Sequence, residues 1–190
     1  MSDTPLAGKV IALMVANGFD EIDFTGAQKR LIKLGATIRV VSRANGLVHG
    51  WYDDSWGHFF PVDVDLVDTL AIDYDGLMIP GGQRSVEKMA EDPHSLRVLK
   101  AFMRASMPVA LIGDAVGLLV LAESAAGRTV TGTASLEEIM TTSEATWQQE
   151  PVVTDTALVT GAGSESAGAA IDAFAGLVAA YRREDDHLAA

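Results

Sequence analysis

The sequence predicts a single α/β domain with a mainly parallel central sheet and helices on both of its faces. Three observations support this prediction: apolar runs of strand length recur along the chain, stretches of helical pattern follow them, and glycines mark turns between the two. A chain of 190 residues suits one hydrophobic core, because chains divide into domains only beyond about 250 residues. We therefore expect one domain over residues 1–190, with its core at about 8–182 and a flexible acidic tail at 183–190.

The first part of the chain predicts a strand, a helix and a second strand. Residues 9–16 (KVIALMVA) form an almost continuous apolar run, which is typical of a parallel strand buried on both faces. Apolar residues then recur at mostly helical spacing from Asp20, acids crowd the first turn, and basic residues precede Gly35. Residues 37–42 (TIRVVS) alternate and are rich in β-branched residues, so we expect a βαβ unit with a right-handed crossover.

The middle of the chain interrupts this rhythm. Residues 45–67 contain turn dipeptides and clustered aromatic residues, and we expect a hairpin or a loop that lies on the sheet edge. Residues 74–80 (YDGLMIP) predict a strand that runs into Gly81 and Gly82, and a helical pattern follows through residues 95–106.

The last part of the chain predicts further strands and two helices. Residues 109–112 form another buried strand, which ends in a glycine turn before a very apolar helix at 118–122. The remaining expected elements are short strands near 129–131, 152–154 and 157–160 and a helix from about 164 to 182.

Composition and charge exclude several classes of protein. Fourteen basic residues against 26 acidic ones give a net charge of −12, which repels nucleic acids and anionic membranes. The N-terminus lacks the basic region of a signal peptide, and no apolar run approaches the roughly 18 residues of a membrane span, so we expect a cytoplasmic protein. The absence of cysteine excludes disulfides and thiolate catalysis, and the four histidines are not at ligand spacing, so we expect neither a metal nor a cofactor.

We place the candidate site at the carboxyl ends of the central strands, because ligands bind there in open parallel sheets. Segments 17–23, 81–85 and 113–117 should meet at this edge. A buried strand followed by a tight turn and an apolar helix is the framework of a nucleophile elbow, in which the turn residue projects its side chain over the sheet. Asp114 is the best candidate for that turn residue.

Five short segments follow one another in a distinctive order. They are VIAL at 10–13, GFDEID at 18–23, DGLMIPGG at 75–82, PVALI at 108–112 and GRTVT at 127–131. Together they resemble the ThiJ/PfpI superfamily, the class I glutamine amidotransferase-like fold, over about residues 8–182, and this resemblance implies a flavodoxin-like three-layer sandwich. In that family the elbow reads Cys-His-Gly or Cys-Ala-Gly, and an acid of the first βα loop bonds the thiol. Here it reads Gly113-Asp114-Ala115, so the cysteine is absent and Asp114 or Gly113 takes its place.

Two subgroups of the family sharpen the comparison. The stretch Asp23-Phe-Thr-Gly26 resembles the Asp-Leu-Thr-Gly loop of isonitrile hydratases, which implies that Asp23 holds the position of the acid facing the elbow. Residues 108–115 (PVALIGDA) resemble the degenerate elbow in the C-terminal domain of large-subunit catalases, which has no recognised activity. Without a cysteine, the protein is neither a cysteine protease nor an amidotransferase.

Three functions therefore stay open. The leading one is a small-molecule-binding or accessory, stress-related module without thiol chemistry. The alternative is a hydratase or hydrolase in which Asp114 and Asp23 act as catalytic residues on a small polarised substrate such as an isonitrile. The third is a purely structural domain, and the presence of a solvent-accessible pocket between the three loops separates it from the others.

Each candidate residue has both a possible functional role and a possible structural role. Two carboxylates in one pocket would share a proton and supply acid and base, and we expect Asp114 within hydrogen-bond or one-water reach of Asp23. Alternatively, Asp114 is a helix N-cap and Asp23 merely stabilises the first turn of its helix. The glycine pair would form an oxyanion hole or simply turn the chain. The expected ligand-binding residues are Gly81, Gly82, Gly113, Ala115, Asp20 and Glu21.

An aromatic cluster lies in the segment between the second and third expected strands. It consists of Trp51, Trp56, Phe59 and Phe60, which either line a pocket or pair two subunits. We expect a homodimer, because the cluster is too apolar to remain exposed as one patch. His58, in the same segment, is the one histidine expected near the pocket.

Overall fold

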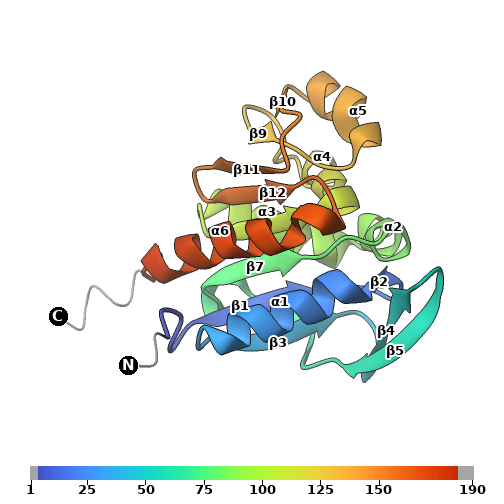
Figure 1. The fold of residues 1–190 in the computed structure, drawn as a ribbon, viewed down its shortest axis with the longest axis vertical. Coiled ribbons are helices and arrows are strands. Elements are labelled where there is room, and N and C mark those ends of the chain that lie inside the picture. The colour runs from blue at the N-terminus through green and yellow to red at the C-terminus, as the bar shows by residue number, and fades with distance from the viewer. Residues whose placement is uncertain (1–3, 184–190) are drawn as a thin grey trace.

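The central sheet of the protein has seven strands in the order β11-β12-β8-β7-β1-β3-β6, in a computed structural model that describes residues 4–183 (Figure 1). The strands are β1 (Val10–Met14), β3 (Thr37–Ser42), β6 (Val64–Asp65), β7 (Gly76–Ile79), β8 (Val109–Ile112), β11 (Val152–Asp155) and β12 (Leu158–Gly161). The β11–β12 pair is antiparallel, and the other pairs in this sheet are parallel. The predicted mainly parallel sheet is confirmed. Of the tail expected at 183–190, Arg183 is held by hydrogen bonds to Asp75, and residues 184–190 lie outside the described residues.

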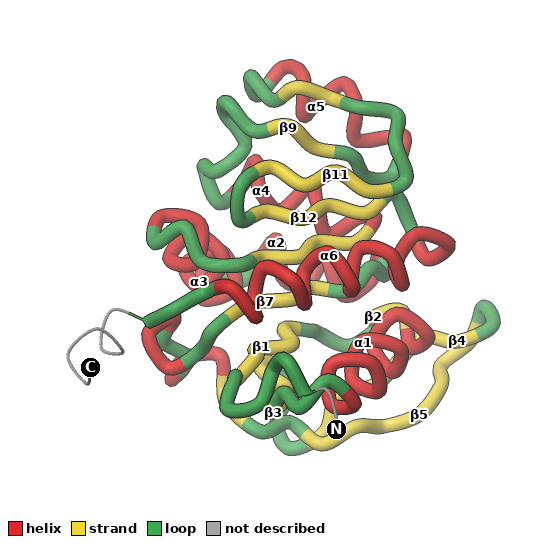
Figure 2. Tube along the Cα trace, turned by 60° about the vertical axis from the view of Figure 1, so that its left-hand side comes forward, coloured by secondary structure: helices red, strands yellow, loops and turns green. Residues whose placement is uncertain are grey.

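Helices cover both faces of this sheet. They are α1 (Glu21–Lys33), α2 (Gln83–Glu91), α3 (Pro93–Arg104), α4 (Leu118–Leu121) and α6 (Ala167–Ala180). A further helix, α5 (Glu137–Thr142), packs against β10 beyond the edge of the sheet. The turns of 3-10 helix are η1 (Leu66–Asp68), η2 (Ala71–Asp73), η3 (Gly113–Gly117), η4 (Ala134–Leu136) and η5 (Ser164–Ser166). Figure 2 shows α1 and α6 together on one face of the sheet, with α2, α3 and α4 behind it. Within residues 4–183, no helix has the length and hydropathy that crossing a bilayer requires.

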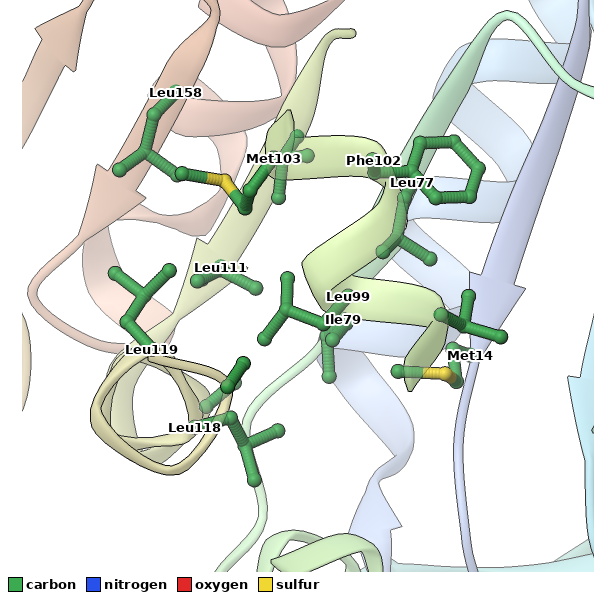
Figure 3. Packing of buried hydrophobic residues seen from close by; sticks show 14 of the residues in the cluster. Met14, Leu77, Ile79, Leu99, Phe102, Met103, Leu111, Leu118, Leu119 and Leu158 are labelled. Atoms are coloured by element: carbon green, nitrogen blue, oxygen red, sulfur yellow. The ribbon is translucent and has the colours of Figure 1, made fainter. Parts of the chain in front are cut away.

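The hydrophobic core has two halves, one on each face of the sheet. Ile11 and Leu13 of β1 belong to the half under α1 and α6, whereas Ala12 and Met14 belong to the half under α2, α3 and α4. This alternation follows from the two-residue period of a strand, and a strand that buries both faces must be apolar throughout. Figure 3 shows the second half, in which the side chains of β7 and β8 meet those of α3 and α4.

The expected excursion at 45–67 is a hairpin on a separate small sheet. This sheet has the order β2-β4-β5, with β2 at Phe19–Asp20, β4 at Leu47–Tyr52 and β5 at Ser55–Pro61. Asp53 and Asp54 connect β4 to β5 with φ angles of +49° and +58°, as a two-residue turn of the tight hairpin type requires. A further pair, β9 (Thr129–Val130) with β10 (Thr146–Trp147), extends the edge beyond β11.

Two expected helices differ from the observed ones. The helical pattern that leads to residues 95–106 is two helices, since α2 ends before Asp92, whose carboxylate accepts a hydrogen bond from the His94 amide and begins α3. Pro93 fits the first turn of α3, where a missing N–H carries no penalty. The last helix begins at Ala167 rather than near 164, because the single turn η5 precedes it.

Candidate functional site

The turn after β8 holds the position of a nucleophile elbow. Gly113 follows the strand directly with a φ of +57°, in the left-handed region that non-glycine residues rarely adopt. Gly113, rather than Asp114, therefore stands at the strained position of the elbow, which decides between the two alternatives. A Cβ built on Gly113 would lie 3.4 Å from the Thr133 hydroxyl, an ordinary contact, so the elbow has room for a side chain and carries none.

Asp114 occupies the second position of η3 and lines a pocket. The N-cap of η3 is Ile112, and no side-chain capping hydrogen bond is made at this turn. The alternative role of Asp114 as a helix cap is therefore not supported. Its carboxylate is partly exposed on the pocket wall, which Asp23 also lines.

Asp20 ties three parts of the site together. Its Oδ1 accepts a hydrogen bond of 3.0 Å from the Asp23 amide and so caps the N-terminus of α1. Its Oδ2 accepts a bond of 3.2 Å from the Ser164 hydroxyl, and its own amide donates to the Gly81 carbonyl at 2.8 Å. The first βα loop is thereby joined to the loop after β7 and to η5.

Asp23 is the most perturbed acid of the site. Its side chain belongs to a residue only 3% exposed, and its Oδ1 has no hydrogen-bond partner among the described residues. Burial raises the pKa of Asp23 to about 6, and the nearby Asp20 charge adds to this effect, whereas the Ser164 hydroxyl and the Gly81 amide oppose it. Asp23 therefore changes its charge close to neutral pH.

Gly81 and Gly82 allow the loop after β7 to approach the first βα loop. Gly82 has a φ of +119°, and a Cβ there would lie 2.6 Å from the Asp20 amide nitrogen and 2.8 Å from the Gly18 carbonyl oxygen. A Cβ on Gly81 would lie 3.3 Å from Oδ2 of Asp23. The pair is needed for close backbone approach, and the Gly81 amide interacts with the Asp23 carboxylate.

Between these loops lies a small pocket of about 210 Å³, open to solvent, at the carboxyl edge of the sheet. Its lining residues are Asp20, Asp23, Gly81, Gly82, Ile112, Gly113, Asp114, Thr133, Gly163 and Ser164. Six of the predicted site residues are thus brought together. Sequence reasoning missed Thr133, Gly163 and Ser164, although Ser164 follows the strand predicted at 157–160 and so had to emerge at the same edge.

Glu21 and Ala115 are not among the lining residues. Glu21 lies beneath the hairpin, where its Oε2 accepts a bond of 2.8 Å from the His58 amide and its Oε1 lies 2.5 Å from His58 Nδ1. Gly57 leaves space for this carboxylate, which a Cβ would overlap. Glu21 and His58 therefore secure the hairpin to α1 and do not reach the pocket, while Ala115 is fully buried in the core.

The carboxylates do not converge as metal ligands would. Within residues 4–183, no group of three or more histidine, cysteine, aspartate or glutamate side chains is arranged to hold a metal ion. The chemistry that the pocket offers is therefore that of hydrogen bonding, charge and proton transfer by its aspartates.

Comparisons with known proteins agree with this architecture. The sequence profile of the DJ-1/PfpI family matches residues 9–175. General stress protein 18 of Bacillus subtilis is 30% identical over 130 residues, which are 68% of this chain and 73% of that protein. Protein DJ-1 homolog D of Arabidopsis thaliana is 34% identical over 115 residues, 58% of this chain but only 29% of the plant protein. A ThiJ/PfpI domain protein from Brachyspira murdochii has the same fold, with a TM-score of 0.83 at 20% identity, over 93% of this chain and 99% of that chain.

Proposed function

Because the chain belongs to the DJ-1/PfpI family, we propose that it is a non-thiol member whose pocket binds a small molecule in an accessory, stress-related role in the cytoplasm. The stress-related part rests on its likeness to a general stress protein of Bacillus subtilis. The binding part rests on one observation: a buried acid, Asp23, lines the pocket, and its Oδ1, which is itself buried, has no partner among the described residues.

An unpartnered buried oxygen favours ligand binding. Such a group costs roughly 1–3 kcal/mol, and native proteins keep few of them. A ligand that donates a hydrogen bond to the Asp23 carboxylate would remove this cost, and the gain would add to its binding free energy. The open pocket between the loops also argues against a purely structural domain.

The first test is a thermal-shift screen of small carbonyls, isonitriles and nucleotides. A compound at a hundred times its Kd should stabilise the wild-type protein by about 2.7 kcal/mol. We expect Asp114→Asn and Asp23→Asn to weaken binding about tenfold or more, since each removes a charged partner worth roughly 1.5–3 kcal/mol. Asp54→Asn in the hairpin turn is the matched control, because asparagine tolerates the φ of +58° there. Unchanged affinity in both pocket variants would contradict the proposal.

A second candidate function is hydration of a small polarised substrate such as an isonitrile. The supporting observation is that Asp23 and Asp114 line one pocket and that the pKa of Asp23 is about 6, near the operating pH that a general acid requires. Asp23 would give its proton to the isonitrile carbon, and Asp114 would take a proton from the water whose oxygen adds to the same carbon. This addition gives the imidic acid R–N=CH–OH, which becomes the formamide when its O–H proton moves to nitrogen, and the proton held by Asp114 returns through solvent to Asp23. The appearance of the formamide in NMR spectra of the screened mixtures would distinguish turnover from binding.

We also propose that two copies of the chain pair through the β4–β5 hairpin. Trp56 is 48% exposed and Phe59 is 60% exposed, and both rings stack on His49 to form one apolar surface. Large aromatic side chains of this kind are enriched at protein interfaces.

Sedimentation at micromolar concentration tests this assembly. The wild-type protein should sediment as a dimer, and Trp56→Asp combined with Phe59→Asp should give a folded monomer, because two buried charges would oppose the contact. Circular dichroism checks that the variant is folded. A wild-type monomer would overturn the proposal.

A further inference from the structure

A second, larger cavity adjoins the aspartate pocket. It has a volume of about 780 Å³ and lies between the β9–β10 pair and the start of α6. Gly163 and Ser164 line both spaces, so one rim separates them. In Figure 1 the β9–β10 pair and α5 lie beyond β11, at that edge of the central sheet.

The two volumes suggest that a single ligand occupies both spaces, with its head group in the smaller one. Binding sites for small molecules usually measure about 300–1,000 Å³, so the 210 Å³ pocket alone takes only a small head group. The larger cavity falls within the usual range. A ligand whose head group reaches Asp23 therefore has space for its remainder across the rim.

Both spaces present negative charge only. The ionisable side chains are Asp20, Asp23 and Asp114 in the small pocket and Glu137, Glu150 and Glu165 in the large cavity. Among the described residues that line either space, none is a lysine, an arginine or a histidine. Clefts lined by one sign of charge focus the field, and the whole chain adds a net charge of −12. Such a field attracts cations and repels phosphates and carboxylates.

The geometry favours an organic cation over a metal ion. Within the described chain no three acidic or histidine side chains are placed to ligate a metal. Trp147 instead lines the larger cavity, and the face of an indole attracts ammonium groups within about 6 Å. In the small pocket, Asp23 is a lining residue whose carboxylate can accept an N–H donor, and the hydrogen-bonding capacity of its buried Oδ1 is unused among the described residues.

We propose that the two spaces together bind an aliphatic diamine or polyamine, with one ammonium group at Asp23 and Asp114 and a second beside Trp147 and the glutamates. The alkyl chain crosses the rim at Gly163 and Ser164. This inference rests on the proposed function, since it names the chemical class of the ligand for the same pocket.

Calorimetric titration with four probes tests the proposal. The probes are spermidine, the diamine cadaverine, the monoamine pentylamine and the diol pentanediol. We expect cadaverine to bind about tenfold more tightly than pentylamine, because each partly desolvated ammonium contributes roughly 1–2 kcal/mol. Pentanediol, which has the same chain length without charge, should not bind, and spermidine should bind at least as tightly as cadaverine.

Variants separate the two ends of the ligand. Trp147→Leu should weaken cadaverine about fivefold or more and leave pentylamine unchanged, since pentylamine has no second ammonium group. Because Trp147 also packs against the core, Glu137→Gln with Glu165→Gln, both on exposed residues, provides a second variant with the same expected pattern. Asp23→Asn should weaken both amines, and Asp54→Asn should weaken neither.

The outcomes distinguish this inference from the proposed function. If pentanediol binds as well as cadaverine, or if a neutral compound of the thermal-shift screen binds while no amine does, the pocket is a ligand site and the diamine inference is overturned. If neither the amines nor the screened compounds bind, both fail. Equal loss of pentylamine and cadaverine in the Glu137 and Glu165 variant would also overturn the placement of the second ammonium group.

Discussion

Replacing Gly82 by alanine is expected to lower the free energy of unfolding by about 3 kcal/mol or more. The φ of +119° puts an alanine in a strained conformation, and its Cβ would lie 2.6 Å from the Asp20 amide nitrogen. The obstructing atoms belong to the backbone, so no side chain can rotate away. The loop after β7 would have to move from the first βα loop, which breaks the bond of 2.8 Å between the Asp20 amide and the Gly81 carbonyl. Denaturant unfolding measures this loss.

Gly127→Ala is the matched control for this experiment. Gly127 has a φ of +76°, but a Cβ there would meet no atom within 4 Å. The control therefore measures backbone strain alone, for which we expect about 1–2 kcal/mol. A larger loss for Gly82→Ala than for Gly127→Ala is expected from the overlap with the backbone atoms and from the less favourable φ of +119° at Gly82, and equal losses would contradict this prediction.

Replacing Asp23 by asparagine is expected to stabilise the protein at neutral pH. Burial raises the pKa of Asp23 from 3.8 to about 6, so in this window the folded chain holds a proton that the unfolded chain has released. The stability contributed by the neutral carboxyl is complete below the unfolded pKa and is lost as the pH rises through the folded pKa. At pH values above the folded pKa this loss amounts to about 3 kcal/mol, since each pKa unit between 3.8 and about 6 corresponds to about 1.4 kcal/mol. Asparagine stays neutral at every pH, so the variant does not undergo this loss of stability.

The measurement is the difference in unfolding free energy between Asp23→Asn and the wild type at a series of pH values. This difference should grow by about 2 kcal/mol in favour of the variant between about pH 4.5 and about pH 7.5. Contributions that are common to both proteins cancel in this difference. Asp54→Asn, at an exposed residue of the hairpin tip, is the matched control for the chemical change from aspartate to asparagine. A constant difference for Asp23→Asn would refute the raised pKa.

Much of the fold follows from patterns that are local in the sequence. The strands at residues 10–14 and 109–112 are apolar throughout because both of their faces are buried, and such runs are visible without a structure. The two-residue strands β2 and β10 are not visible, since they exist only because a distant segment pairs with them. The break between α2 and α3 did leave a signal, namely an aspartate followed by a proline at residues 92 and 93.

The site was predictable in position but less so in detail. The rule that ligands bind at the carboxyl ends of parallel strands found Asp20, Asp23 and Asp114. Glu21 was misplaced because adjacent helical residues point in different directions: Glu21 faces the hairpin, whereas Asp23, two positions later, faces the pocket. The sequence Gly-Asp-Ala does not determine which residue adopts a positive φ, and the φ of +57° at Gly113 identifies it as the elbow residue.

The glycine at the elbow lowers the backbone strain that the rest of the fold must offset. A non-glycine residue held at a φ near +57° costs about 1–2 kcal/mol, which the surrounding structure must offset. Gly113 removes most of that strain. The free energy released at the elbow is of the same order as the cost of keeping Asp23 buried and ionised at neutral pH. The glycine at one wall of the pocket and the desolvated acid at the other therefore affect the stability of the fold by comparable amounts and in opposite directions.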